Sequence, residues 1–429
     1  MKLETKNENN ADLIFRTIFV FIIGYFFYGY ITDENAAGAG GYNGDFNLIW
    51  KNLNLYKNGI LENLNNPEYT DSRFPFSYIF HSIINPFADN KESFRHSVFI
   101  LSCLVPILFY QCLKQVANET SNDKIILVSS LILLSPYFRT SAYWGLGENY
   151  SFIFLCLSFL AFHNIKINYE INSKKKKNLL LIGVSFFSSL CFYFDQKLII
   201  IPLMIYLSLF LMLSKYEKIL FTIYYFIFSL PCLYLVTIWG SILPPDAADS
   251  RLISEKFNFY NLGYAVTIIA FYIFPFLILK NKTQIMKLKT KQNLIIIMLF
   301  IFYLTFLVID NNFENLPMLG KGIFHKLYLI IFEKDYLRFL FTMITFLICF
   351  LILLIYFEKN YSKLLVFYFV FSSMIIFPFM QEYLDPLLFI LLLTFLNEKI
   401  LIDRNLVISL TIFYSLFLFG TKIYYNITL

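Results

Sequence analysis

Charged residues are scarce in this chain of 429 residues. Asp, Glu, Lys and Arg together make up 15% of the sequence, whereas hydrophobic residues make up 58%. Soluble domains use about 25% charged and about 45–50% apolar residues, so this composition excludes an ordinary soluble protein. The sequence therefore predicts an all-α polytopic membrane protein.

Cysteine and histidine are also few, with six and four residues, respectively. The cysteines all lie within apolar runs, and no two of them have a metal-binding spacing. We expect them to be small core residues without a disulfide framework. Because no His, Asp and Glu residues cluster at ligand spacing, the residues do not indicate a metal cofactor.

Long apolar runs recur along the whole sequence. A helix needs about 17–25 apolar residues to cross a membrane, and most runs are near that length, which predicts about 12 or 13 spans. The weakest is 386–397, since about 12 residues cover only about 18 Å. No linker or fixed repeat divides the chain, so we expect one integral membrane domain over residues 1–429. The runs are 13–31, 97–113, 125–138, 150–165, 179–194, 198–213, 219–240, 259–279, 293–309, 337–357, 364–380, 386–397 and 405–420.

Lysine and arginine gather in the short loops on one side of these predicted spans. With the N-terminus on that side, the alternation of spans brings together Lys114, Lys174–Lys177, Lys215 and a cluster from Lys280 to Lys291. Cytoplasmic loops carry such an excess, so we expect a plasma-membrane or inner-membrane protein with a cytoplasmic N-terminus. The net charge of +6 then reflects topology and contact with membrane lipids, and it indicates no nucleic-acid partner. The longer loops, at about 32–96, 241–258 and 310–336, would lie outside.

The first outer loop, residues 32–96, is the longest. Apolar residues recur at spacings of three and four from Phe46 to Ile60, which predicts an amphipathic helix lying on the outer leaflet. Asp45 falls at the N-terminus of this helix, where it could cap free backbone N–H groups. The same position would keep its carboxylate ionised, as a catalytic base requires, so capping and catalysis are compatible.

Two further segments on the outer side carry charge beside aromatic residues. Asp71 and Arg73 precede the stretch Phe-Pro-Phe-Ser-Tyr at 74–78, in which Pro75 opens a second short apolar helix. The next outer loop places Arg139 and Glu148 at the ends of neighbouring spans. These two residues fit either ordinary interfacial positions or a site for a polar substrate.

Taken in order, these features resemble the GT-C superfamily of polytopic membrane glycosyltransferases, which includes protein O-mannosyltransferases and aminoarabinose transferases. The resemblance rests on the first span, on Gly44-Asp45 before an amphipathic helix, on the 74–78 stretch and on the late loop Gln381–Pro386. It covers residues 1–165 in order and the late loop more loosely.

The resemblance implies an inverting, hexosyltransferase-like enzyme at the extracytoplasmic face. Its donor would be a sugar on a polyprenyl phosphate, and its acceptor a lipid, a glycan or a protein. An acidic residue early in the first outer loop would be the catalytic base; Asp45 matches best, and Asp33 and Glu34 are competing matches. Relatives often have two neighbouring acidic residues where this chain has only Asp45, so the choice stays open. Some relatives use a divalent metal.

Inverting transfer also needs a cation that holds the departing phosphate. Lys321 and Lys326 are candidates, although both could instead reach lipid headgroups from an interfacial helix at 322–332. His325 fits an interfacial polar residue better than a base. The predicted substrate-binding residues are Asp33, Glu34, Asp71, Arg73, Arg139, Glu148, Arg251, Lys321, His325, Lys326, Arg338 and Glu382.

Two other functions are compatible with an outward-facing membrane protein. A transporter or flippase of lipid-linked saccharides would place charged residues or broken helices near the bilayer midplane, whereas these spans are almost free of charge. A lipid-linked polysaccharide polymerase would be expected to have a large, arginine-rich late loop, whereas the largest loop here is the first.

Overall fold

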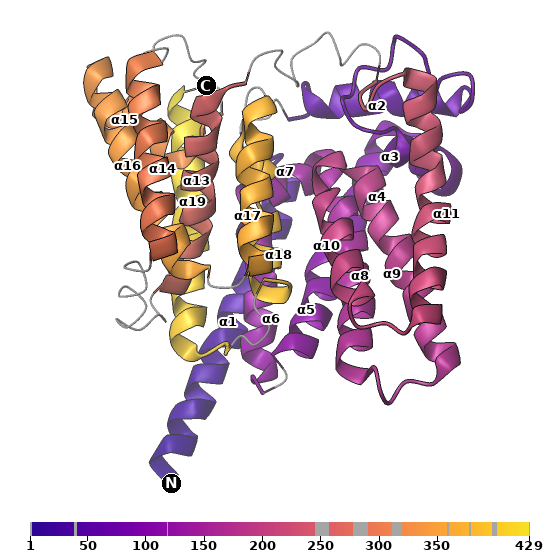
Figure 1. The fold of residues 1–429 in the computed structure, drawn as a ribbon, viewed down its shortest axis with the longest axis horizontal. Helices are drawn as coiled ribbons and strands as arrows, with labels where there is room; N and C mark the ends of the chain where they lie inside the picture. Colours follow the sequence, from indigo (N-terminus) through magenta and orange to yellow (C-terminus); the bar gives the residue numbers. More distant parts are fainter. Residues whose placement is uncertain are drawn as a thin grey trace. The chain divides into compact units, whose positions relative to one another are not determined.

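The computed structural model describes the chain except for a few short segments. The described residues are 2–37, 41–117, 119–244, 257–277, 291–310, 320–357, 360–376, 379–396 and 401–428. Within these ranges the elements are helices (Figure 1), as the predicted all-α class requires. The chain divides into two compact units, Met1–Asp249 with Leu393–Leu429, and Ser250–Leu392. The expectation of a single integral domain stays a prediction.

Unit 1 contains most of the helices and the first loop. They are α1 (Lys2–Ile31), α2 (Asp45–Lys57), α3 (Phe76–Ile84), α4 (Lys91–Ser102), α5 (Leu104–Val116), α6 (Asn122–Ser130), η1 (Leu131–Leu134), α7 (Pro136–Trp144), α8 (Glu148–Asn168), α9 (Lys174–Phe194), η2 (Gln196–Leu198), α10 (Ile200–Phe210), α11 (Lys215–Trp239) and α19 (Arg404–Thr428).

Unit 2 is smaller. Its helices are α13 (Phe259–Leu277), α14 (Lys291–Asp310), α15 (Gly322–Ile331), α16 (Asp335–Tyr356), α17 (Asn360–Ser372), η5 (Ser373–Ile375) and η6 (Gln381–Tyr383), and α18 (Leu387–Thr394) crosses the boundary of the two units in sequence.

Nine helices in the described ranges are long and apolar enough to cross a membrane. A tenth span arises if Asn122–Leu134 and Pro136–Trp144, which meet at an angle of 70°, count as one. The bend follows from Pro136, because a proline forces the residue before it out of the helical conformation, and Ser135 is extended with ψ 123°. A membrane protein is thus confirmed, whereas the count of 12 or 13 spans stays a prediction, because nine or ten refers to long helices within the described residues alone. Three predicted runs instead form the shorter helices Gln196–Phe210, Ser362–Ile375 and Leu387–Thr394.

One of these short helices still connects the two ends of unit 1. Asp195 precedes Gln196–Phe210, and Ser214 follows it. Beyond the C-terminal end of this helix, Glu217 of α11 accepts a hydrogen bond from Ser214. It also accepts one, at 2.6 Å, from Tyr169, which follows α8. The connections α8–α9 and α10–α11 therefore lie together, at the end of unit 1 opposite α2 and α3 (Figure 1).

Both predicted loop helices form, and the apolar side of α2 packs on protein. In α2 the residues at spacings of three and four, Phe46, Ile49, Leu53 and Tyr56, are all buried. Phe46 stacks on Phe94 of α4 with ring centres 6.2 Å apart. The helix predicted to lie on lipid therefore covers the ends of the spans of unit 1.

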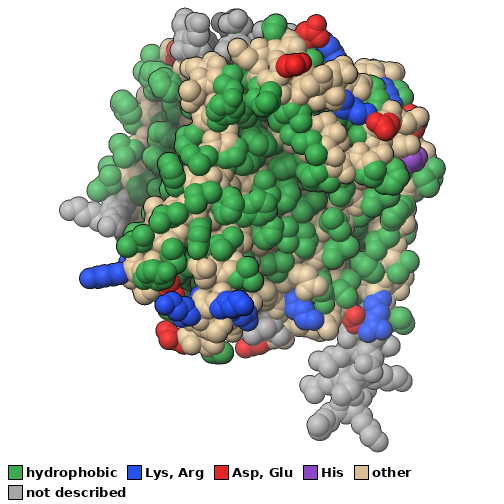
Figure 2. Space-filling model, turned by 90° about the vertical axis from the view of Figure 1, so that its right-hand side faces the viewer, with side chains coloured by type: hydrophobic (Ala, Val, Ile, Leu, Met, Phe, Trp, Pro, Cys, Tyr) green, Lys and Arg blue, Asp and Glu red, His purple; other side chains and the backbone are tan. Residues whose placement is uncertain are grey.

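The surface of one face divides into an apolar belt and two polar rims. Figure 2 shows hydrophobic side chains over the middle of this face, with charged side chains along its upper and lower edges and several Lys and Arg among those of the lower edge. Large exposed apolar residues of α11, among them Ile219 and Phe226, are 62% and 60% exposed. Such a belt is stable only in contact with lipid.

The predicted orientation can be tested by labelling. In a variant lacking the native cysteines, Lys51→Cys on α2 and Lys176→Cys at the start of α9 place exposed thiols at opposite ends of unit 1. We expect a membrane-impermeant maleimide added to intact cells to label position 51 and not position 176. The reverse pattern would place α2 in the cytoplasm and contradict the orientation inferred from the lysines.

Candidate functional site

A group of five charged side chains lies at the α2 and α3 end of unit 1. We call it the Arg73 cluster, and it consists of Asp71, Arg73, Glu148, Asp195 and Lys197. Arg73 forms an ion pair with Glu148, and its Nη1 lies 3.9 Å from Oδ2 of Asp71. Nζ of Lys197 lies 3.4 Å from Oδ2 of Asp195 and 3.9 Å from Oε1 of Glu148. Three carboxylates thus share two cations.

Three separate segments supply these residues. Asp71 and Arg73 lie between α2 and α3, Glu148 begins α8, and Asp195 and Lys197 form the turn between α9 and α10. Asp195 stabilises that turn by accepting a hydrogen bond from the backbone N–H of Lys197 at 3.2 Å. Glu148, as the first residue of α8, is also favoured by the positive end of the helix dipole.

Burial controls the charge states in this cluster. Asp195 is 3% exposed, and burial raises the pKa of its carboxyl although the charges of Lys197 and Arg73 oppose the shift. Burial alone would lower the pKa of Arg73, but Glu148 and Asp71 more than compensate and raise it, so the guanidinium stays charged. A raised carboxyl pKa beside fixed cations is a typical feature of functional sites.

Aromatic side chains enclose the Asp71 side of the cluster. The hydroxyl of Tyr78 donates to Asp71 at 2.6 Å, and that of Tyr69 donates to the backbone oxygen of Arg73 at 2.7 Å. Tyr56 stacks on Tyr78 with ring centres 6.3 Å apart. These rings separate the charges from bulk water, which strengthens every electrostatic interaction within the cluster.

Several buried polar atoms beside the cluster lack a hydrogen-bond partner among the described residues. They include Oε2 of Glu148, Nε2 of Gln196 and the hydroxyl of Tyr56. Leaving such a group unsatisfied costs about 1–3 kcal/mol. The arrangement therefore favours a polar ligand that can complete these hydrogen bonds.

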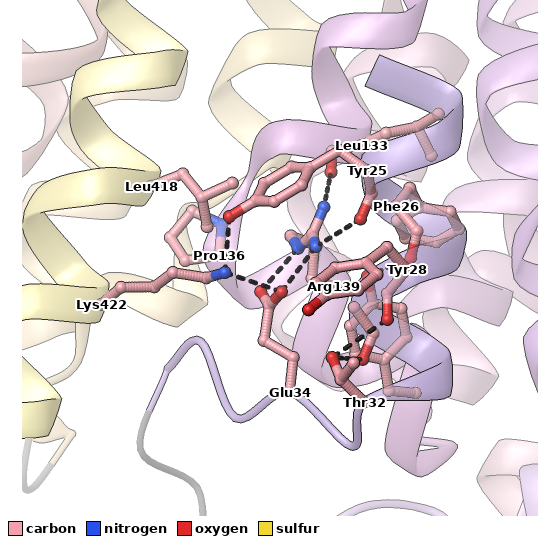
Figure 3. A network of polar contacts seen from close by, with 12 residues as sticks. Tyr25, Phe26, Tyr28, Thr32, Glu34, Leu133, Pro136, Arg139, Leu418 and Lys422 are labelled. Carbon is pink, nitrogen blue, oxygen red and sulfur yellow. Dashed lines mark hydrogen bonds and ion pairs between the residues drawn. The ribbon is translucent and has the colours of Figure 1, made fainter. Parts of the chain in front are cut away.

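A second ionic group holds the C-terminal end of α1 (Figure 3). Arg139 has no exposed surface, and its Nε and Nη2 donate to the two carboxylate oxygens of Glu34 at 2.8 and 2.7 Å. Nζ of Lys422 lies 2.8 Å from Oε2 of Glu34 and donates to the hydroxyl of Tyr25 at 2.6 Å. Burial alone would raise the pKa of Glu34, but hydrogen bonding and charge from Arg139, and then from Lys422, lower it. Both oxygens of Glu34 are therefore engaged in holding helices together.

The close approach of these groups depends on Gly29. A Cβ at this position of α1 would overlap side-chain atoms of Arg139, Glu34 and Tyr143. Arg139 also donates to the backbone oxygens of Leu133 and Tyr25, each at 3.1 Å. With these acceptors in place the guanidinium is suited to a structural role, not to holding a phosphate.

The other two candidate acids of the first loop form no ion pair with Arg139 or Lys422 among the described residues. Asp33 adopts a positive φ of 52°, is largely exposed, and accepts a hydrogen bond from Arg95 at 2.5 Å. Asp45 is the first residue of α2 and is half-buried, whereas the N-cap is Gly44. Asp45 therefore does not occupy the N-cap position considered from the sequence. Its assignment as the base stays a prediction.

In unit 2 the candidate residues gather around the start of α15. Lys321 precedes the helix with φ 65° and is 6% exposed, and its Nζ lies 5.9 Å from the centre of the Tyr264 ring. Within the described ranges no carboxylate forms an ion pair with it. Burial lowers its pKa to about 8. A buried cation without an anionic partner is costly, which makes Lys321 a candidate anion-binding residue.

The remaining candidates of unit 2 differ in environment. His325 is buried in α15, and burial, together with the charges of Lys321, Arg338 and Lys326, lowers its pKa to about 3. Burial also lowers the pKa of Lys326 to about 8, against the charge of Glu382. Arg338 pairs with Asp335 at 2.7 Å. Arg251 lies outside the described residues.

Four of the charged residues at these sites were not predicted. Asp195 and Lys197 stand between two apolar runs, and that pattern of paired charges at a span end could have revealed them. Arg95 and Lys422 carry no such signal, because their partners lie far away in sequence; Lys422 bonds to Tyr25, 397 positions earlier. In the part of the chain that the structure describes, no group of three or more His, Cys, Asp or Glu could hold a metal ion.

No family model, no curated protein and no solved structure matches this chain. The resemblance to the GT-C superfamily thus rests on the sequence features alone.

The ionic group at Glu34 should be essential for stability. We expect Arg139→Gln to reduce the free energy of unfolding by about 3–5 kcal/mol, because it leaves a buried carboxylate without its main partner. The measurement is denaturant unfolding of the purified protein in detergent.

A matched control is Arg16→Gln. Arg16 pairs with Asp123 at 2.9 Å, but its side chain is 68% exposed. Exposed pairs contribute about 0–1 kcal/mol, so this variant should unfold almost like the parent protein. Equal effects of the two substitutions would contradict a special role for the buried pair.

Proposed function

We propose that this chain is a membrane glycosyltransferase with a GT-C-like architecture. It would transfer a sugar, with inversion, from a polyprenyl-phosphate donor to an acceptor at the membrane face where α2 and α3 lie. The lysine-rich connections at the opposite end support an extracytoplasmic position for this face.

The observation that carries the proposal is the Arg73 cluster with its unsatisfied polar neighbours. A sugar presents several hydroxyl groups, each of which can donate to a carboxylate and accept from an amide or a phenol. Glu148 Oε2, Gln196 Nε2 and the Tyr56 hydroxyl offer acceptors and donors of both kinds in one buried region. Aromatic side chains such as Trp239, which stacks on Phe74 with ring centres 5.5 Å apart, give this region an apolar wall.

The chemistry requires one ionised carboxylate to take the proton of the acceptor hydroxyl. We assign this role to Asp45, which the resemblance favours and which lies at the positive end of the α2 dipole. Glu34 is a poor base because both of its oxygens accept from cations. Glu148 and Asp71 would bind sugar hydroxyls.

On the donor side, the polyprenyl phosphate leaves as an anion and needs a cation rather than a proton. Four of the five N–H groups of Arg139 already donate to protein acceptors. Among the candidate cations named from the sequence, Lys321 of unit 2 is buried and has no carboxylate partner among the described residues, so it stays the candidate for the leaving phosphate.

The base assignment predicts a specific loss of turnover. Asp45→Asn should lower kcat by about 100-fold or more while donor binding is retained, because the amide cannot accept the proton. The assay incubates the purified protein with a panel of polyprenyl-phosphate hexoses and follows release of polyprenyl phosphate. Asp89→Asn is the control, since Asp89 lies in the same loop and its side chain is 91% exposed.

Two outcomes would change the proposal. Loss of kcat in Glu148→Gln with normal turnover in Asp45→Asn would move the base to Glu148. If no polyprenyl-phosphate hexose is consumed, and none accumulates in cells that lack the protein, glycosyl transfer from such donors is excluded.

The cation assignment predicts a pH dependence. Because the pKa of Lys321 is lowered to about 8, its charge is present below that pH and is lost as the pH rises through it. We expect kcat/KM to fall above about pH 8 in the parent protein and to stay level in Lys321→Arg, whose guanidinium remains charged. Lys321→Gln should be slow at every pH, whereas Lys334→Gln, at an exposed lysine of the same unit, should match the parent. An unchanged profile in Lys321→Gln would remove Lys321 from the mechanism.

A further inference from the structure

A cleft of about 300 Å³ lies between α9 and α11, at the end of unit 1 opposite the Arg73 cluster. Its lining residues are Lys174, Lys175, Asn178, Leu181, Tyr216, Glu217 and Leu220. Both helices begin here, α9 at Lys174 and α11 at Lys215. The cleft is remote from every residue assigned to glycosyl transfer in this unit, so its function is a separate question.

The surroundings of the cleft are strongly basic. The sequence around the cleft contains six lysines and two acidic residues. The lysines are Lys174–Lys177, Lys215 and Lys218, and the acids are Glu170 and Glu217. The positive ends of the two helix dipoles add to this potential. The region therefore attracts an anion.

The one carboxylate that lines the cleft is already committed. Oε2 of Glu217 accepts from the backbone N–H of Ser214 at 3.0 Å, from its hydroxyl at 2.7 Å and from Tyr169 at 2.6 Å. Lys177 and Lys218 are also engaged, with their Nζ atoms 3.9 and 5.0 Å from the ring centres of Tyr169 and Phe210. Lys174 and Lys175 are the exposed lysines that line the cleft itself.

Apolar surface continues directly from the cleft along both helices. Leu179 of α9 and Ile219 of α11 are 68% and 62% exposed, and Ile223, one turn further, is 44% exposed. A soluble anion would gain nothing from these side chains. A lipid would place its acyl chains on them while its phosphate reached the lysines.

We propose that the cleft between α9 and α11 binds the headgroup of an anionic phospholipid, held by Lys174 and Lys175 with its acyl chains along Leu179, Ile219 and Ile223. Tyr216 closes one side of the site, and its ring centre lies 5.2 Å from Nζ of Lys174. The lysines that orient the chain in the membrane would then also provide a specific lipid site.

The test compares two double variants that remove the same charge. Lys174→Gln with Lys175→Gln removes the two lysines that line the cleft. Lys176→Gln with Lys215→Gln removes two exposed lysines of the same region that do not line it. The full-length protein in detergent is titrated with phosphatidylglycerol or phosphatidylcholine, and retained lipid is counted by native mass spectrometry.

We expect the cleft variant to bind the first phosphatidylglycerol about tenfold or more weakly than the parent, and the control variant to stay within about threefold. Phosphatidylcholine should bind weakly and equally to all three proteins. Equal losses in both variants would show diffuse attraction by the lysines and overturn the site. If inorganic phosphate competes for the site as effectively as phosphatidylglycerol does, the site binds a free anion and the lipid assignment is overturned.

Since all four lysines are exposed, gel filtration should show an unchanged fold. If the cleft variant aggregates, Lys175→Gln against Lys176→Gln gives the same comparison with one charge each.

Discussion

Arg139 has no exposed surface, yet it carries a full charge that must be neutralised where it lies. Its two bonds to Glu34 and its bonds to Leu133 and Tyr25 meet that requirement, and each partner comes from a different part of the chain. The loop that leaves α1 is thereby held against the bend before α7. From there the chain continues into α2, α3 and α4, so the position of the first loop over the span ends depends on this buried pair. Breaking the pair would release the loop that carries Asp45 and Asp71.

The Arg73 cluster also consists of buried ion pairs, but one of its carboxylate oxygens has no hydrogen-bond partner among the described residues. At Glu34 two cations, Arg139 and Lys422, share one carboxylate, and both of its oxygens accept hydrogen bonds or ion-pair contacts from them. At the Arg73 cluster three carboxylates share two cations, and Glu148 Oε2 has no hydrogen-bond partner among the described residues. A carboxylate with both oxygens engaged stabilises structure, whereas a buried oxygen without a partner leaves interaction energy for a ligand. This contrast separates the structural ions from those proposed to bind substrate.

Much of the fold could be predicted from the sequence, because apolar runs and helix signals are local. The amphipathic pattern from Phe46 to Ile60 predicted α2, and Pro75 predicted the start of α3 within one residue. The number of spans stays a prediction, since within the described residues the apolar runs at 198–213, 364–380 and 386–397 form helices shorter than 18 residues. The ionic partners could not be predicted where they join distant segments. Nothing near Glu34 in sequence points to Lys422, and nothing near Arg73 points to Asp195.

The contact between Glu34 and Lys422 has a consequence for biogenesis. It joins the first helix of the chain to α19, which leaves the ribosome only after all the intervening helices have been made. Until then Glu34 and Arg139 can pair with each other, but the third ion of the group is missing. The ionic group is therefore completed late in membrane insertion, and the α1–α7 pair must persist without Lys422 while the later helices are synthesised.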